Sequence, residues 1–166
     1  MLDQRLYKKS ISSEDSDPVP LMPLTPDYGG ALMCYGNGVF DSQFNCYLTV
    51  REDRRESSTN PTTTIVSVDL SINNVEEHRI LVEGNDFYAF PRIDHKGERW
   101  PGLNGVMPWD ISELCVGYIS ENGDVQNRTC IAGGDPSIVE SPTEPMWSPE
   151  GPLLDFSTQY IVNNFG

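Results

Sequence analysis

Proline and glycine recur along the whole chain and set the strongest limit on its fold. The 166 residues include 13 prolines and 14 glycines, so structure-breaking residues occur every few positions. Proline inside a helix removes a hydrogen bond, and glycine there costs about 1 kcal/mol relative to alanine. No window therefore predicts a long uninterrupted helix. The segments between the breakers have the length of strands, and we expect an all-β fold.

Short runs of β-branched and aromatic residues lie between these breakers. The clearest are 64–70 and 113–119, in which apolar residues alternate or run together over strand length. Turn-forming residues at 94–97, 121–124 and 148–151 predict hairpin connections. The predicted strands are 5–8, 31–35, 47–51, 63–70, 79–82, 87–93, 113–119 and 128–132.

A longer repeat organises these strands. Similar aromatic and turn-rich motifs occupy 40–45, 90–97 and 146–151, each before a strand-like segment. Their spacing of about fifty residues is the length of one four-stranded propeller blade. After the first two motifs come a strand, a loop, an apolar strand and a further strand ending in glycine. The order predicts a β-propeller, and unrelated meander units of a β-sandwich are the alternative that the spacing leaves open.

The charge of the chain limits its partners. The formal net charge is −14, with only 11 basic residues and no basic stripe, so a phosphate backbone or an anionic membrane would be repelled. The N-terminus has no apolar run of signal-peptide length, and no stretch approaches the roughly 20 apolar residues that cross a bilayer. We expect a cytoplasmic chain that binds neither nucleic acid nor membrane.

The cysteines predict neither a metal site nor a redox motif. Cys34, Cys46, Cys115 and Cys130 are scattered without a Cys-x-x-Cys pair, and the chain has only two histidines. Buried free thiols are the expectation, with disulfides as the alternative. No phosphate-binding glycine loop occurs either, so the sequence indicates no cofactor.

Several short motifs, taken in order, resemble one known family. Together they look like the propeller of the prolyl oligopeptidase family of serine peptidases, in its acylaminoacyl-peptidase and dipeptidyl-aminopeptidase branch. The resemblance covers nearly the whole chain and implies a partial β-propeller of about three blades of four-stranded antiparallel sheet. The motifs are 50–56, Val-Glu-Gly-Asn-Asp-Phe-Tyr-Ala-Phe-Pro-Arg at 82–92, Met-Pro-Trp-Asp at 107–110, Ala-Gly-Gly-Asp at 132–135, Glu-Ser-Pro at 140–142 and Trp-Ser-Pro-Glu-Gly at 147–151.

The resemblance implies a lid rather than a catalyst. In that family the propeller caps an α/β-hydrolase domain, gates substrate access, and leaves the Ser, Asp and His to a downstream domain. No Gly-x-Ser-x-Gly turn occurs in this sequence. Ser137 follows a proline and predicts a plain turn, and His78 and His95 predict solvated positions. We expect no catalytic residue and no enzyme activity in the chain as it stands, with peptide substrate reached only through a catalytic domain.

The predicted domain is 1–151, and 152–166 is predicted to be a divergent tail. Within the domain, 10–20 is rich in Ser, Asp and Pro and predicts an exposed loop. Segment 100–106 contains one proline and two glycines, so it is poorly specified for the middle of a blade.

The densest charge cluster is Asp53-Arg54-Arg55-Glu56. On a blade loop, Arg54 or Arg55 could bind a substrate carboxylate, and we name both as candidate substrate contacts. The alternative is a solvated turn of mutual ion pairs without a function.

Two other readings of the whole chain compete with the lid. One is a stand-alone protein-interaction module, since exposed strand edges can pair with a peptide, a partner protein or a second copy. The other is an unstable product that aggregates, because an open stack of blades leaves unpaired edges and uncovered faces.

Overall fold

The computed structural model describes residues 6–12, 16–21, 32–71, 78–94, 96, 99–105, 112–135, 137, 140–149 and 154–160. These residues form an all-β fold, as predicted. None of them belongs to a helix long and apolar enough to span a bilayer. The strands are β1 (Tyr7–Lys8), β2 (Val19–Pro20), β3 (Met33–Asp41), β4 (Cys46–Asp53), β5 (Thr62–Asp69), β6 (Arg79–Val82), β7 (Phe87–Ala89), β8 (Arg99–Gly105), β9 (Ser112–Ile119), β10 (Val125–Gly133), β11 (Glu140–Trp147) and β12 (Leu154–Tyr160).

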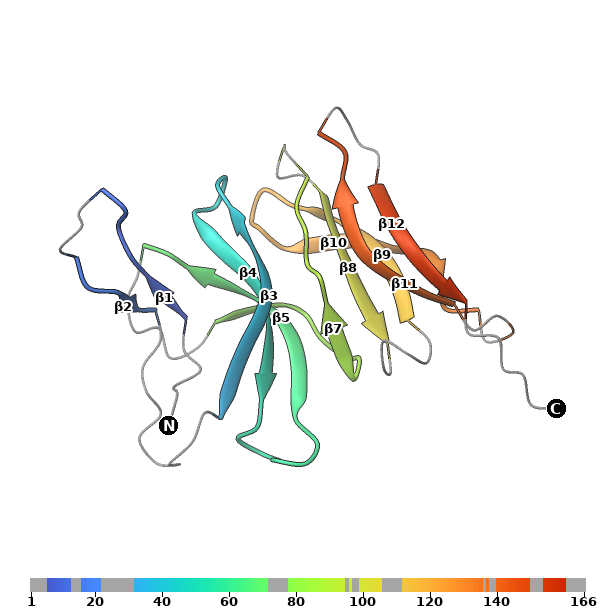
Figure 1. The fold of residues 1–166 in the computed structure, drawn as a ribbon, viewed down its shortest axis with the longest axis horizontal. Helices are drawn as coiled ribbons and strands as arrows, with labels where there is room; N and C mark the ends of the chain where they lie inside the picture. Colours follow the sequence, from blue (N-terminus) through green and yellow to red (C-terminus); the bar gives the residue numbers. More distant parts are fainter. Residues whose placement is uncertain are drawn as a thin grey trace.

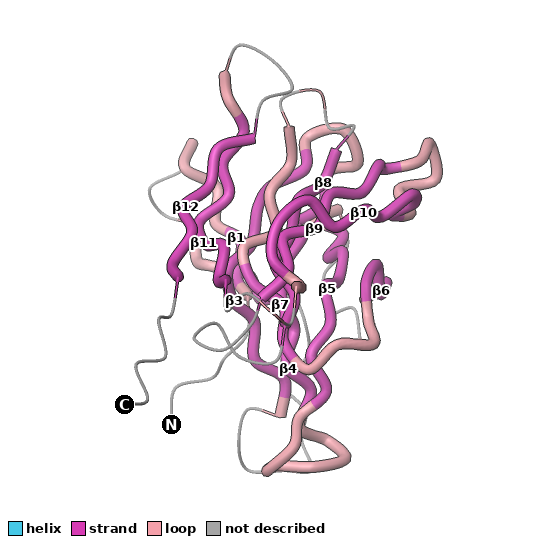
Figure 2. Tube along the Cα trace, turned by 90° about the vertical axis from the view of Figure 1, so that its right-hand side faces the viewer, coloured by secondary structure: helices cyan, strands magenta, loops and turns pink. Residues whose placement is uncertain are grey.

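The strands pair into antiparallel sheets that follow the order of the chain. Two sheets have four strands each, β3-β4-β5-β6 and β7-β8-β9-β10, and they are flanked by the pairs β1-β2 and β11-β12. Figure 1 shows the sheets standing one after another along the long axis, and Figure 2 looks along that axis from the end at which β11 and β12 lie. A succession of up-and-down four-stranded sheets is the blade pattern of a propeller. The predicted partial propeller of about three blades is therefore confirmed.

The fifty-residue repeat marks the same turn in successive sheets. Its first copy connects β3 to β4, its second connects β7 to β8, and its third connects β11 to β12. In the first copy the Asp41 carboxylate accepts hydrogen bonds from the backbone N–H groups of Gln43 at 2.9 Å and Phe44 at 3.2 Å. Asn45 then turns the chain with a φ of 48°. Each blade thus begins one strand before its motif, whereas the sequence placed the motif at the blade entrance.

Strand β5 is buried on both faces and holds the core together. Its Ile65 packs with Leu48 and Tyr88 in a cluster that faces the second four-stranded sheet. Its Val66 and Val68 face the opposite way and pack with Leu21, next to the β1-β2 pair. Complete burial of a side chain of this size stabilises a fold by about 1.5–3 kcal/mol. The alternation along β5 therefore fixes a layer on each side of the first sheet.

Strand β8 is the clearest departure from the sequence prediction. It pairs with both neighbours, although its proline and glycines predicted a poorly specified segment. The pairing with β7 covers only Leu103, Asn104 and Gly105. Pro101 pairs with Val116 of β9 and lies beyond the end of β7. Proline is tolerated there because β8 has a neighbour on one side only.

Smaller differences lie at strand ends. The predicted loop at 10–20 contributes Val19–Pro20 to a pair with β1. The predicted strand 87–93 ends at Ala89, because Phe90 takes a φ of 51° and a proline follows it. Beyond the predicted boundary at 151, β12 pairs along β11 from Leu154 to Tyr160. Part of the predicted tail therefore continues the last sheet.

His78 is buried, which corrects its predicted solvated position. The residue is only 6% exposed, and its ring meets the Tyr35 ring edge-on with centroids 5.7 Å apart. Neither ring nitrogen has a hydrogen-bond partner among the described residues. Burial first, and then the positive charge of Arg51, lower the pKa of His78 below its ordinary value. The two glutamates that precede His78 in the sequence favoured an exposed side chain. The residue is buried instead because it lies beside β5.

Replacing Gly133 with alanine should destabilise the chain by roughly 2 kcal/mol or more. Gly133 has a φ of +74°, and a Cβ there would lie 2.0 Å from the Ser112 carbonyl oxygen. Gly36→Ala is the matched control, because nothing lies within 4 Å of its Cβ position. Urea unfolding followed by circular dichroism measures both variants. Equal midpoints for the two variants would refute the tight approach of β9 and β10.

The buried His78 should make the fold sensitive to mild acid. Because its pKa is lower in the folded chain than in the unfolded one, its contribution is complete above the unfolded value of about 6.5 and is lost as the pH falls below it. Carboxylates titrate mainly at lower pH, so histidine dominates the pH dependence of stability between about pH 7 and pH 5. We expect His78→Leu to reduce the loss of unfolding free energy between about pH 7 and pH 5. An unchanged pH dependence in this variant would contradict the burial of an uncharged ring.

Candidate functional site

The two arginines predicted to contact substrate lie on the loop between β4 and β5. Arg54 Nε forms an ion pair with Glu52, and Arg55 Nη2 donates to Asp53 Oδ2 at 2.7 Å. Partial burial opposes ionisation of Asp53, but hydrogen bonds from Arg55 hold the pKa of Asp53 below its ordinary value. The arginine side chains are 44% and 43% exposed, so each pair contributes less than about 1 kcal/mol. Substrate contact by Arg54 and Arg55 stays a prediction.

A third arginine lies beside this loop and escaped the sequence analysis. Arg51 pairs with Tyr35 on one side and Thr64 on the other, so the three form a row across β3, β4 and β5. Arg51 is only 7% exposed, and its Nε has no hydrogen-bond partner among the described residues. Burial raises the pKa of Tyr35 to about 12 although the charge of Arg51 opposes the shift. Arg51 is therefore a buried cation, whereas the two loop arginines lie at the surface.

A hollow of about 340 Å³ separates the first sheet from the β9-β10 turn. Two carboxylates line it, but local groups use their oxygens: Asp41 binds the turn described above, and Asp69 Oδ1 accepts from Ser71 N at 2.8 Å and Ser71 Oγ at 2.6 Å. Across the hollow, Arg79 donates to the Asn122 carbonyl oxygen at 2.5 Å and pairs with Asp124. These contacts join the two sheets and offer no nucleophile with its base.

The described residues do not assemble a serine hydrolase site. Ser137 N and Ser137 Oγ both donate to Asp135 Oδ1, at 2.8 Å and 2.6 Å, and so close a local turn, as predicted. His78 hydrogen-bonds no serine in the described part of the chain. The predicted turn at His95 and the Met-Pro-Trp-Asp motif at 107–110 lie outside the described residues. Catalytic chemistry therefore has no support in this part of the structure.

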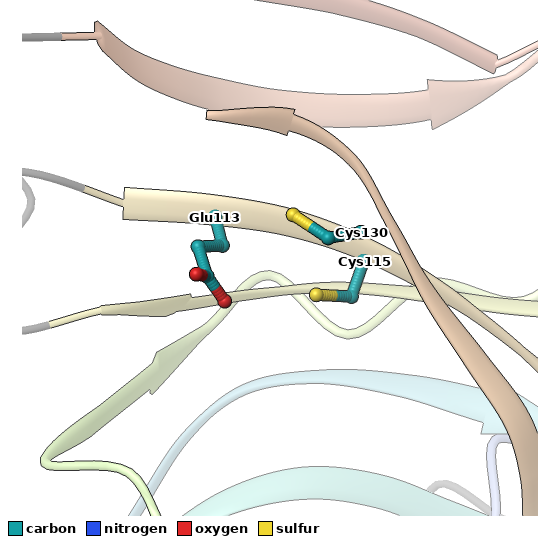
Figure 3. Close-up of side chains that lie close together, drawn as sticks. All are labelled: Glu113, Cys115 and Cys130. Carbon is teal, nitrogen blue, oxygen red and sulfur yellow. The ribbon is translucent and has the colours of Figure 1, made fainter. Parts of the chain in front are cut away.

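The cysteines are free thiols, as predicted, but they are not all buried. Cys46 and Cys115 are buried, Cys34 is half-buried, and Cys130 is exposed. Burial of Cys130 was a wrong prediction, because β10 lies at the edge of its sheet. Cys115 and Cys130 pair directly across β9 and β10, and Glu113 precedes Cys115 by two residues. One donor atom from each of the three lies within 4.8 Å of the others (Figure 3).

Comparison with known proteins gives likeness in structure alone. No protein-family model matches the chain, and no curated protein matches it. A puromycin-hydrolysing peptidase from Mycobacterium tuberculosis is similar with a TM-score of 0.71 and 26% identity, over 87% of this chain and 22% of that one. Two structures of puromycin hydrolase, one of them a mutant in complex with PGG, have TM-scores of 0.79 and 0.80 at 22% identity, over 94% of this chain and 24% of theirs.

The chain thus spans less than a quarter of the length of these peptidases. The sequence resemblance to a propeller of this kind is confirmed, whereas the acylaminoacyl-peptidase or dipeptidyl-aminopeptidase branch stays a prediction. The chain is a segment with the β-propeller fold of the prolyl oligopeptidase family of peptidases.

Proposed function

We propose that the chain is part of the propeller lid of a serine peptidase and does not itself hydrolyse peptides. The likeness to puromycin-hydrolysing peptidases over 87–94% of this chain, with TM-scores of 0.71 to 0.80, carries the proposal. A propeller segment alone would limit the access of substrate and would supply no reacting group. Hydrolysis would then depend on a catalytic domain, which supplies the serine, the histidine and the acid.

The chemistry of the described residues supports a role without catalysis. Ser137 and Asp135 are engaged with one another in a turn, and His78 is buried and held neutral. An activated serine needs a histidine within hydrogen-bond reach. Ser137 has no such contact with His78, whose ring nitrogens have no hydrogen-bond partner among the described residues. The loop arginines Arg54 and Arg55 are the part of this segment that we expect to meet a substrate carboxylate.

A cytoplasmic location belongs to the same proposal. The free thiols support it, because reducing compartments keep cysteines unpaired. The net charge of −14 supports a lid that repels polyanions and meets peptide instead of nucleic acid.

The first test of the lid separates it from a cryptic hydrolase. Purified chain should release no chromophore from aminoacyl anilides and should gain no mass from a fluorophosphonate probe, which labels activated serines. Ser137→Ala is the control for any labelling that occurs. Labelling of the chain that this variant abolishes would overturn the proposal.

A chimera tests gating itself. In it, this chain replaces the matching propeller segment of a puromycin hydrolase, and hydrolysis is measured on substrates of increasing length. We expect short aminoacyl substrates to be cleaved and the limit on longer peptides to change. In the same chimera, Arg54→Ala with Arg55→Ala should raise KM for substrates with a free carboxylate and leave blocked ones unchanged. A folded chimera with an unchanged length limit would contradict gating by this segment.

The exposed strand edges favour a second candidate, a protein-interaction module. Strand β10 is the outer strand of its sheet and carries Ile131, which is 48% exposed. An open edge with an apolar side chain is a template for a further strand.

One positive charge on this edge should weaken self-association through β10. We expect Ile131→Lys to shift the chain toward the monomer in sedimentation velocity, because lysine on an edge opposes pairing. Ile11→Lys is the control, since Ile11 is fully exposed outside any strand. Equal sedimentation of the parent chain and both variants would exclude the β10 edge as the contact.

A further inference from the structure

The strand pair β9-β10 brings together three side chains that the sequence keeps apart. Cys115 and Cys130 are direct partners in the antiparallel register, and Glu113 pairs with Gly133. Residues two apart on a strand share a face, so Glu113 and Cys115 lie on the same side of β9. Figure 3 shows the side chains on the two neighbouring strands, with both sulfur atoms directed to the side on which Glu113 lies.

The backbone around this group leaves room for the carboxylate. The register of β10 shifts between Cys130 and Ala132, and Gly133 and Gly134 follow with φ of 74° and 79°. A Cβ at Gly134 would lie 2.7 Å from Glu113 Oε1. Any other residue at 134 would press on the carboxylate. The irregular end of β10 therefore lets Glu113 lie close to the two sulfurs.

The donor set selects one class of ion. We propose that Glu113, Cys115 and Cys130 bind a zinc ion. Zinc accepts thiolate at about 2.3 Å and carboxylate at about 2.0–2.2 Å, so tetrahedral donors stand roughly 3.5–3.8 Å apart. The three donor atoms lie within 4.8 Å of one another, and small side-chain rotations close the difference. Hard cations avoid thiolate and monovalent copper disfavours carboxylate, so the set suits a borderline divalent ion, and zinc accepts both ligand types in protein sites.

The surrounding charges fit a bound cation. Partial burial of its sulfur first, and then the neighbouring Cys115 and Glu113, raise the pKa of Cys130 to about 11. Metal binding releases the protons of its thiol ligands. Two thiolates and one carboxylate around zinc leave one negative charge, and the Arg128 guanidinium, which contacts Cys115, can balance it.

The site has three protein ligands and one position left. Among the described residues no further Cys, His, Asp or Glu joins the group. Cys130 is exposed, so solvent water can supply a fourth ligand. The ion would join the inner strand β9 to the outer strand β10 and so strengthen the edge of the second sheet. This inference rests on the side chains of β9 and β10 alone and does not depend on the lid.

The test uses the whole reduced chain, with its four thiols counted before metal is added. Cobalt titration should give one equivalent per chain with a sulfur-to-cobalt charge-transfer band whose intensity indicates two thiolates. Zinc should displace cobalt with loss of that band and should raise the melting temperature. Competition with a chromogenic chelator gives the zinc affinity.

Three variants decide which residues bind. Cys130→Ser and Glu113→Gln should weaken zinc binding by more than about 10-fold, because loss of even a supporting residue has an effect of that size. Cys34→Ser removes a thiol from the other sheet and should bind like the parent chain. Circular dichroism checks that each variant folds. If a variant does not fold, the cobalt band of the parent chain still tests whether the site exists. No thiolate band, or equal affinity in all three variants, overturns the site, as does a Cys115–Cys130 disulfide in protein purified without reductant.

Discussion

The burial of both faces of β5 is the constraint on which the rest of the structure depends. A strand with one solvent-exposed face can lie in a single sheet that is covered on one side only. In β5 the side chains of Ile65, Val66 and Val68, which point to both faces, have no solvent-accessible surface. The second sheet must therefore cover one face, and the β1-β2 pair must cover part of the other. Beside the covered face, the β9-β10 turn lies against Arg79, and the hollow lies between this turn and the first sheet. The stacking of sheets is thus a consequence of one apolar strand.

Local chemistry determined how much of the fold could be predicted. Strands such as β5, β6 and β9 were predictable because apolar runs between turn residues have few alternatives. The aromatic repeat was also readable, although it marks the first hairpin of each blade and not its beginning. Strand β11 was missed, and β8 and β12 were expected only as strand-like segments after the repeat motifs. Prolines in β8 and β11 argue against strands when only the local sequence is considered. What decides these cases is which side of the strand has a neighbour, and a sequence window does not contain that information.

In the candidate sites too, local sequence predicted the features that depend on adjacent residues and missed those that depend on neighbouring strands. The Arg54 and Arg55 cluster was visible because its members are adjacent, yet their ion pairs are local and exposed. Arg51 was overlooked and the burial of His78 was predicted wrongly, because burial depends on the sheets packed over both residues. Cys115 and Cys130 look unrelated in the sequence, and only the antiparallel register makes them partners. Counting outward from the 121–124 turn would have placed Thr129 opposite Cys115, because an irregularity between Gln126 and Thr129 shifts the register by one residue.

The pairing of β8 has a consequence for how the second sheet moves. From Leu103 to Gly105 this strand is bonded on both sides, but from Arg99 to Gly102 only β9 holds it. Separating that first half from β9 breaks fewer hydrogen bonds than separating any strand with two neighbours. The backbone amides of this half should therefore exchange with solvent through a local opening that leaves β9 and β10 paired. The short strand β7, which ends at Ala89, thus leaves half of β8 as the part of this sheet that we expect to open first.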